Sequence, residues 1–284
     1  MNGLRLLSRD IRLGLLRKSY IVLLLIIPFA YAVTRQCRVD ITMYTENNVL
    51  NSACTVLDYW IYSMGGMNVF KFDPEVMFEI PVFWFWFVIC ASYINAYYVR
   101  KDLDDQGAAV ILASGKRTSW WLSKSALCVI KVTLYFLMSM ILVVLFALAN
   151  GAQFSCEITS EFLMNRFGFN TVYCSNGDFL VLTVFLPWLT VCAICIAQNA
   201  LSLYLGSVVS FIAVSVLYIL SAYYTTWFLP GNYTMWLRSS YFTKEGISPL
   251  TGAAVSAGII LAAMITGVMY INNSDILSKN TDNQ

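Results

Sequence analysis

The chain has 284 residues, of which 59% are hydrophobic and only 12% are charged. Soluble globular domains carry about 25% charged residues, so the composition excludes an ordinary water-soluble domain. Histidine is absent, which removes the commonest general base and the commonest metal ligand and weakens every enzymatic interpretation. We therefore expect an all-α integral membrane protein, with residues 1–284 forming a single transmembrane domain.

The first predicted element is an amphipathic helix at residues 1–18. Its apolar residues recur at helical spacing: Leu4, Leu7, Ile11 and Leu15. Arginines line a neighbouring face: Arg5, Arg9 and Arg12. A basic helix with an apolar stripe lies in the membrane plane against anionic headgroups, so we expect these arginines at the membrane interface. The alternative is a basic flank that only sets the topology of the first span.

The same region also fits a secretory signal peptide. A basic segment over 5–18 would precede the apolar stretch 21–29, and Ala30-Tyr31-Ala32 would supply a small-residue cleavage site. We expect the region to be retained as the first span.

Six apolar stretches predict transmembrane helices, because about 20 apolar residues cross a bilayer. They lie at 19–34, 78–99, 122–149, 179–199, 202–228 and 249–271, and the polar residues Gln198, Asn199 and Ser202 predict a tight turn between the fourth and the fifth. Ten Lys and Arg residues fall in the segments predicted on the same side of the membrane as the N-terminus. The longer segments on the opposite side hold six. The positive-inside rule thus predicts a multi-pass plasma membrane protein, which we expect to be bacterial, with both termini in the cytosol.

The predicted extracytoplasmic loops are 35–77, 150–178 and 229–248. The first two hold two cysteines each: Cys37 and Cys54, then Cys156 and Cys174. Four cysteines allow three connectivities. We favour one disulfide within each loop, because an oxidising space permits such bonds, and the alternative is four free thiols.

The longest predicted cytosolic loop is 100–121. Acidic residues open a short amphipathic stretch, where they suit a helix N-terminus: Asp102, Asp104 and Asp105. Apolar residues follow at Leu103, Val110, Ile111 and Leu112, and Gly115 can end the helix.

This layout resembles the permease of a type-2 ATP-binding cassette (ABC) exporter. In that family the loop runs from an acidic residue and Gly through a Leu-rich turn to a small residue or Pro, then Ser-Arg, with Lys opening the third span. The residues that fit this order are Asp105, Gly107, Leu112, Ser114, Arg117 and Lys124. The chain departs from it where Ser114-Gly115-Lys116 replaces the Pro and where Ala108 replaces a Thr.

The resemblance implies that this loop is a coupling helix that docks on a separate ATPase subunit. The residues that it implies for ATPase coupling are Asp102, Asp104, Asp105, Gln106, Gly107 and Leu112. The alternative is a solvated connector without a partner.

The chain carries no ATP-binding motif of its own. A Walker A loop needs G-x-x-x-x-G-K-[ST], and the nearest approach, at Gly115-Lys116, has Val110 in place of the first Gly. We therefore expect no cofactor and no metal in this chain, with ATP and Mg bound by the partner ATPase.

Lys131 is the deepest charge in the predicted spans. We expect its long side chain to reach back to the cytosolic interface, and the alternative is a place in the translocation path. Lys124, at the inner edge of its span, is expected to reach water. A catalytic pair of Lys131 with Ser123 or Ser125 is the enzymatic alternative, although nothing in the spacing favours it.

The resemblance thus implies a permease subunit that pairs with a second copy or a paralogue and is driven by two ATPase copies, and we expect the chain to contact the lipid bilayer but no nucleic acid. An apolar and aromatic lining from spans one, two and five would suit an amphipathic or hydrophobic cargo, a peptide before a lipid or a drug. The alternative is a stand-alone channel or an accessory membrane protein without ATP coupling.

Overall fold

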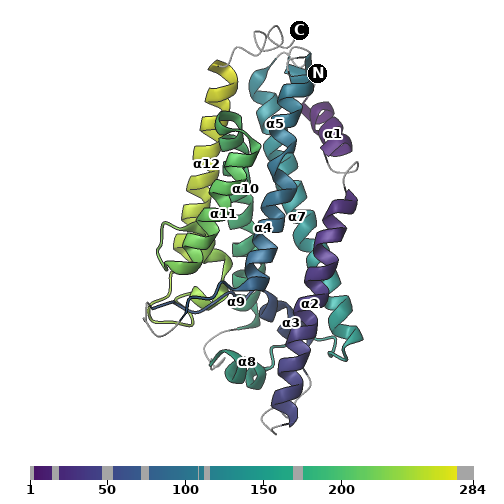
Figure 1. The fold of residues 1–284 in the computed structure, drawn as a ribbon, viewed down its shortest axis with the longest axis vertical. Coiled ribbons are helices and arrows are strands. Elements are labelled where there is room, and N and C mark those ends of the chain that lie inside the picture. The colour runs from purple at the N-terminus through teal and green to yellow at the C-terminus, as the bar shows by residue number, and fades with distance from the viewer. Residues whose placement is uncertain are drawn as a thin grey trace.

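The computed structural model describes residues 3–14, 19–46, 54–71, 77–107, 109–111, 116–168 and 175–273. Among these residues all regular structure is helical, as the composition predicted (Figure 1). The long helices are α2 (Ser19–Glu46), α4 (Val82–Ala96), α7 (Arg117–Ala149), α10 (Leu186–Leu205), α11 (Ser207–Tyr223) and α12 (Pro249–Asn273). The shorter elements are α1 (Gly3–Gly14), α3 (Val56–Ser63), α5 (Tyr98–Asp102), η2 (Leu103–Gly107), α8 (Ser160–Phe167), α9 (Asn176–Leu180), η4 (Val181–Phe185), η5 (Pro230–Thr234) and η6 (Trp236–Arg238).

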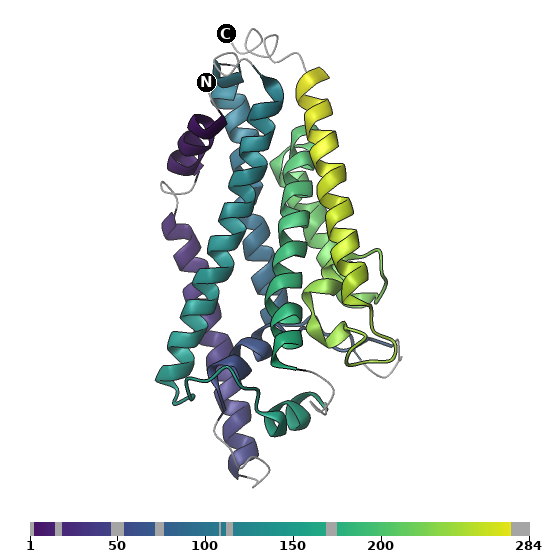
Figure 2. The same cartoon turned by 180° about the vertical axis from the view of Figure 1, so that it is seen from behind.

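The six long helices form a bundle of two layers. Helices α2, α4 and α11 make the face seen in Figure 1, and α7, α10 and α12 make the face seen from behind in Figure 2. Helix α1 and the C-terminal end of α12 lie at one end of the bundle, which we call the α1 end. Helices α3 and α8 lie at the other, which we call the α3 end.

Helix α10 is the centre of this bundle, packed against α4, α7, α11 and α12. A bundle helix surrounded in this way is apolar on all sides, and most of its side chains are buried. Helix α12 buries a stripe of small residues, which allow close approach of its neighbours: Gly252, Ser256, Ala263 and Gly267. Gly252 faces Tyr233 of η5 and Gly267 faces Trp121 of α7, while Ser256 faces α10. The hydroxyls of Thr190 and Ser256 lie 3.0 Å apart across this contact.

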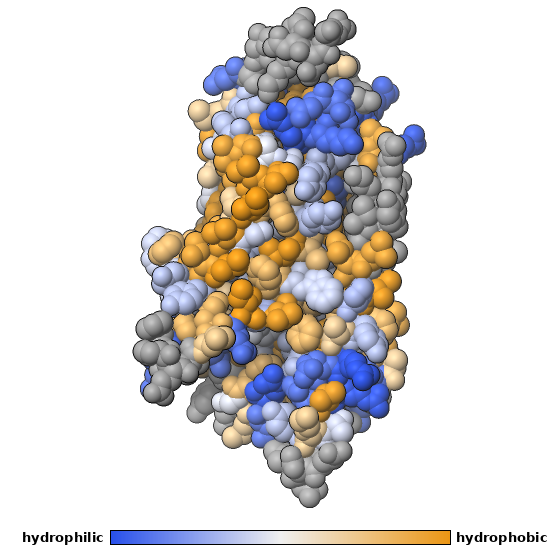
Figure 3. Space-filling view, in the orientation of Figure 1, coloured by the Kyte–Doolittle hydropathy of each residue, from blue (hydrophilic) through white to orange (hydrophobic). Residues whose placement is uncertain are grey.

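Four helical segments in the described part of the chain are long and apolar enough to cross a membrane. They are Val82–Asp105, Arg117–Ala149, Gly177–Leu205 and Pro249–Asn273. The other two predicted spans are also helical: α11 is apolar but has only 17 residues, and α2 has 28 residues that include charges in its second half. In Figure 3 a broad apolar band crosses the middle of one face, with hydrophilic side chains gathered toward both ends.

The turn between the fourth and fifth predicted spans lies at Gly206, and not between 199 and 202 as predicted. Gln198, Asn199 and Ser202 are buried inside α10. Gln198 Nε2 donates to the backbone oxygen of Ser92, so its polar side chain is used in helix packing. Gly206 ends α10 because it has φ +85° and ψ 163°, a conformation open almost only to glycine.

Gly267 is expected to tolerate no side chain, because a Cβ there would overlap the indole ring of Trp121 on α7. We predict that Gly267→Ala lowers stability by about 1–3 kcal/mol, the usual result of overfilling a packed interface. Gly258→Ala on the same helix is the matched control, since nothing lies within 4 Å of a Cβ built there. Thermal unfolding in detergent, followed by tryptophan fluorescence, measures both, and equal midpoints would contradict this packing.

Candidate functional site

A group of charged side chains is buried at the α1 end, where α1, α5 and the start of α7 meet. Lys124 Nζ lies 2.6 Å from Asp10 Oδ1 and 2.8 Å from Asp102 Oδ2. Arg9 Nη2 lies 3.0 Å from Asp102 Oδ1. The formal charges of Arg9, Asp10, Asp102 and Lys124 cancel, and we call these four residues the charge network.

Uncharged side chains donate further hydrogen bonds to the carboxylate oxygens of Asp10 and Asp102. Ser123 Oγ donates to Asp10 Oδ2 at 2.6 Å. Tyr98 Oη donates to Asp10 Oδ1 at 3.0 Å. Trp120 Nε1 donates to Asp102 Oδ2 at 3.2 Å. Desolvated charges persist in a protein only when their remaining hydrogen-bonding capacity is met in this way, so the network is a complete buried site rather than a surface ion pair.

The sequence of α1 explains how Asp10 reaches the interior. Leu6 and Asp10 are four residues apart, lie on the same helical face and are both fully buried. Gly14 ends the helix close to α7, and a Cβ there would come within 2.8 Å of Leu127 and 2.9 Å of Tyr98. Helix α1 therefore packs on protein, chiefly on α7, along its buried face.

The three arginines assigned to the membrane interface separate into two groups. Arg5 and Arg12 are exposed and free to meet a headgroup layer. Arg9 turns inward to Asp102, with 21% of its side chain exposed. The spacing of the arginines could not distinguish them, because the acidic partner is 93 residues away along the chain.

The acidic residues assigned to ATPase coupling also differ in accessibility. Asp102 is buried in the charge network. Asp104 is exposed and pairs with Arg100 at 3.0 Å, one helical turn earlier. Asp105 is exposed, whereas Gly107 is buried. The side chain of Gln106 and all of Leu112 lie outside the described residues.

This segment does not begin a new helix at Asp102, as the acidic run suggested. Helix α5 follows α4 after the single residue Tyr97, and the π-helical turn η2 continues it to Gly107. A π-turn adds a residue to the helical repeat and often marks a functional position. Here it follows Asp102 directly, so the buried acid and the exposed acids belong to one continuous helical segment.

Both lysines of α7 lie beside the ring of Tyr98. Lys124 Nζ is 4.6 Å from the ring centroid and Lys131 Nζ is 4.7 Å from it. The prediction that Lys124 reaches water is wrong, since its side chain is 0% exposed and bound by two acids. Lys131 is buried as well and lies over the ring of Tyr98, whose hydroxyl donates to Asp10 of the network. Ser123 donates to Asp10, which is not the arrangement of a Ser–Lys dyad.

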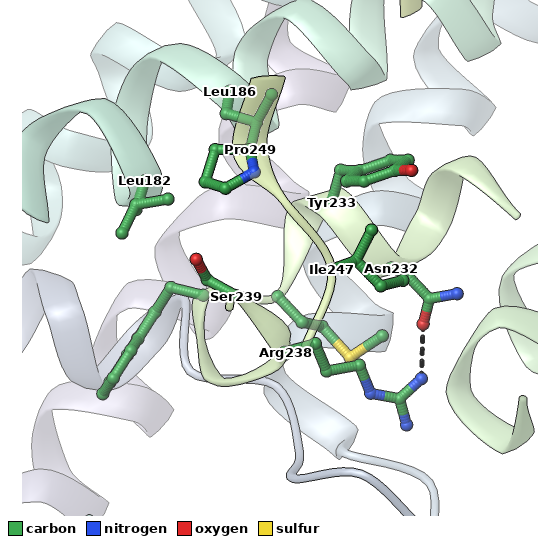
Figure 4. A pocket seen from close by; sticks show the side chains of 10 residues that line it. Leu182, Leu186, Asn232, Tyr233, Arg238, Ser239, Ile247 and Pro249 are labelled. Atoms are coloured by element: carbon green, nitrogen blue, oxygen red, sulfur yellow. Dashed lines mark hydrogen bonds between the residues drawn. The ribbon is translucent and has the colours of Figure 1, made fainter. Parts of the chain in front are cut away.

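Another buried cation, Arg238, lies near the α3 end, and among the described residues its hydrogen bonds all go to uncharged oxygen atoms. Its guanidinium donates to the backbone oxygens of Ser221 and Ala222 at the C-terminal end of α11, and to Asn232 Oδ1 (Figure 4). Burial lowers the pKa of Arg238 to about 10, so the side chain stays cationic at neutral pH. The positive charge suits the negative end of the helix dipole and fixes η5 and η6 onto α11.

Three of the four predicted disulfide cysteines are thiols in this structure. Cys37 and Cys54 are buried, Cys156 is exposed, and Cys174 lies outside the described residues. Their pairing stays a prediction. Within the described ranges, no group of three His, Cys, Asp or Glu side chains is placed to hold a metal ion.

Sequence reasoning missed Asp10 altogether and named Lys124 only as the lysine that opens the third span in the resembled loop order, expected to reach water. Each is an isolated charge in an apolar setting: Asp10 is the only acid of the first helix, and Lys124 stands among apolar and small residues. Opposite isolated charges of this kind are a signal for a buried pair. The partners could not be assigned from spacing, because 114 residues separate them.

Comparison of the chain with known family models, with characterised proteins and with solved structures finds no match.

We predict that Lys124→Met lowers the stability by about 3–5 kcal/mol, since it removes the fully buried one of the two cations that neutralise Asp10 and Asp102. Lys71→Met is the control, because Lys71 forms an ion pair with Glu245 in which both side chains are exposed. Thermal unfolding in detergent measures the difference. Equal effects of the two substitutions would show that Lys124 is not buried between acids.

Arg9→Gln is expected to destabilise the protein, while Arg12→Gln should leave the unfolding midpoint unchanged. The reason is that Arg9 neutralises the buried Asp102, whereas Arg12 is exposed on the same helix. Both variants carry the same Arg→Gln change on α1, which makes them a matched pair. If both shift the midpoint equally, α1 is not oriented with Arg9 inward.

Proposed function

We propose that this chain is the membrane-spanning permease subunit of an ATP-driven exporter. Three observations support the proposal: a bundle of apolar helices, a short basic helix before the first long helix, and the loop order that resembles type-2 ABC exporter permeases. A force-transmitting subunit needs one more property, a rigid link between the surface that a motor touches and the spans that move.

The charge network is the observation that carries the proposal. Asp102 belongs to the helical segment that leads into the resembled coupling loop, Arg9 and Asp10 belong to α1, and Lys124 belongs to α7. Each bond therefore joins two different elements. Displacing the loop without moving α1 and α7 would separate buried charges, which is costly, so the three elements move as one body.

The surface offered to a motor lies just outside this network. Asp104 and Asp105 are exposed on the turn that follows the buried Asp102, and Lys101 is exposed beside them. A partner ATPase can bind these residues while the next turn of the same helix holds α7. ATP and Mg would be bound by that partner, present in two copies.

The transport route is proposed to lie between two permease copies, this chain and a second copy or a paralogue. Spans one, two and five correspond to α2, α4 and α11, which form one layer of the bundle (Figure 1). Large apolar side chains are exposed on this layer, among them Leu24 and Ile27, Tyr93 and Tyr97, and Val208 and Ile212. Such a lining suits an amphipathic or hydrophobic cargo, with a peptide favoured over a lipid or a drug.

The second candidate function is a stand-alone channel or an accessory membrane protein. In that role the four charges of the network would only fix α1 to α5 and α7, with no motor to move these elements. Association with an ATPase is the feature that separates the two candidates.

The test is to purify the full-length chain, tagged at its native locus, in mild detergent and to assay the preparation for ATP hydrolysis. We expect an ATPase to co-purify. Asp105→Ala and Gly107→Leu should reduce its association several-fold, whereas Glu245→Gln, an exposed acid at the α3 end, should not. Absence of any ATPase, or full activity in the Asp105 and Gly107 variants, would overturn the proposal.

A further inference from the structure

Two buried thiols meet at the α3 end, Cys37 on α2 and Cys54 just before α3. Both lie in the same apolar core, with Cys37 0% and Cys54 5% exposed. Helices α2 and α3 pack against each other, as Figure 1 shows.

Three hydrogen bonds fix the segments that carry these cysteines. Arg38 Nη1, next to Cys37, donates to Asn150 Oδ1 at 2.9 Å. Three residues later in the same turn, the amide of Gln153 donates to the backbone oxygen of Cys54 at 3.0 Å. Tyr62 Oη at the end of α3 donates to Asp40 Oδ2 on α2 at 2.9 Å. One turn after α7 thus holds both cysteine segments, and α3 is tied back to α2 beyond them.

Acidic groups surround the pair. Asp58 is fully buried beside it and accepts hydrogen bonds from the amides of Thr55 and Thr159. Burial holds the pKa of Cys37 well above its usual value, with smaller contributions from Cys54, Asp58 and Asp40. Burial raises the pKa of Cys54 to about 12. In the folded protein both sulfurs would therefore be protonated, buried and slow to react, because the thiolate is the reactive form.

We propose that Cys37 and Cys54 form a disulfide bond, made during folding on the extracytoplasmic side of the membrane. The bond joins α2 to the segment that enters α3. The location rests on the topology of the proposed exporter, in which the α3 end faces outward.

The oxidant is a disulfide-bearing protein or small molecule of the extracytoplasmic space. One cysteine thiolate attacks a sulfur of that disulfide and releases one thiol, which leaves a mixed disulfide. The second cysteine thiolate then displaces the other oxidant sulfur. Two cysteine thiols are oxidised to one disulfide, the oxidant is reduced to two thiols, and the two cysteine protons are transferred to them. The reaction takes place during folding, because the two cysteines are then still exposed to the oxidant.

The bond would unite the outer part of α2 with α3 and the turn after α7. A covalent link over the 37–54 loop restricts the unfolded chain and so stabilises the folded one. It also requires that α2 and the loop segments at this end move together.

The test uses the full-length chain from intact membranes, alkylated under denaturing conditions without reduction and digested for mass mapping. The expected product is a cross-linked peptide pair containing Cys37 and Cys54, lighter by two hydrogen atoms than the two thiol peptides. Alkylation of both residues without prior reduction would overturn the proposal. So would a cross-link that joins either one to Cys156 or Cys174.

Stability gives a second readout. Reduction should lower the unfolding midpoint of the wild-type protein by several degrees more than that of the double variant Cys37→Ser/Cys54→Ser. Cys90→Ser, a buried thiol on α4, is the control and should retain the effect of reduction. Equal sensitivity of the double variant to reduction would contradict the bond.

The orientation is measured separately with Glu245→Cys, placed on an exposed side chain at the same end. A membrane-impermeant maleimide applied to intact cells should label it. Labelling together with free Cys37 and Cys54 refutes the disulfide and leaves the exporter topology standing. If the residue is labelled only in opened cells, the α3 end faces the cytosol, and both the topology and the disulfide are refuted.

Discussion

The ammonium of Lys124, held between the carboxylates of Asp10 and Asp102, is the interaction on which the α1 end of this protein depends. It lies where the chain would otherwise have three independent parts: an N-terminal helix, the end of one span and the start of another. Charges in such a place are costly to bury, and they are retained here with their hydrogen bonds complete. The network fixes the rotation of α1 about its own axis, because only one face of that helix carries Asp10.

This constraint gives the N-terminal helix a position set by protein contacts as well as by the membrane surface. A helix that only rests on a membrane is held by its apolar stripe and by headgroup contacts, and it can slide. Helix α1 has exposed arginines suited to that role, yet its position is set by protein contacts to α7 and Asp102. In the proposed exporter, a motor that pushes on the adjacent loop would move α1 and α7 together. The Arg238 site fixes η5 and η6 in a comparable way at the opposite end.

Much of the fold could be predicted from hydropathy and charge. The all-helical architecture is confirmed, and each of the six predicted stretches contains a long helix, four of them in segments apolar and long enough to cross a membrane. The predicted break at Gln198 failed because polarity alone does not distinguish a turn from a side chain that bonds a neighbouring helix. Gly206 was the better signal, since its conformation is one that other residues avoid.

The site was less predictable than the fold. Local patterns assigned Arg9 to lipid and Lys124 to water, and the family resemblance assigned Asp102 to a partner protein. All three side chains bond instead to residues distant in sequence. Periodicity reports the environment of a helical face on average, and it carries no information on which distant face will meet it. Pairing isolated opposite charges is the step that would have come closest.

The central claim is that buried charges, rather than the lipid surface, hold α1 in place. Hydrogen–deuterium exchange of the backbone amides in lipid nanodiscs tests it most directly, because exchange reports local opening of a helix. The account predicts that Lys124→Met accelerates exchange throughout residues 3–14 and leaves α12 unchanged. Unaltered protection of α1 in that variant would contradict it.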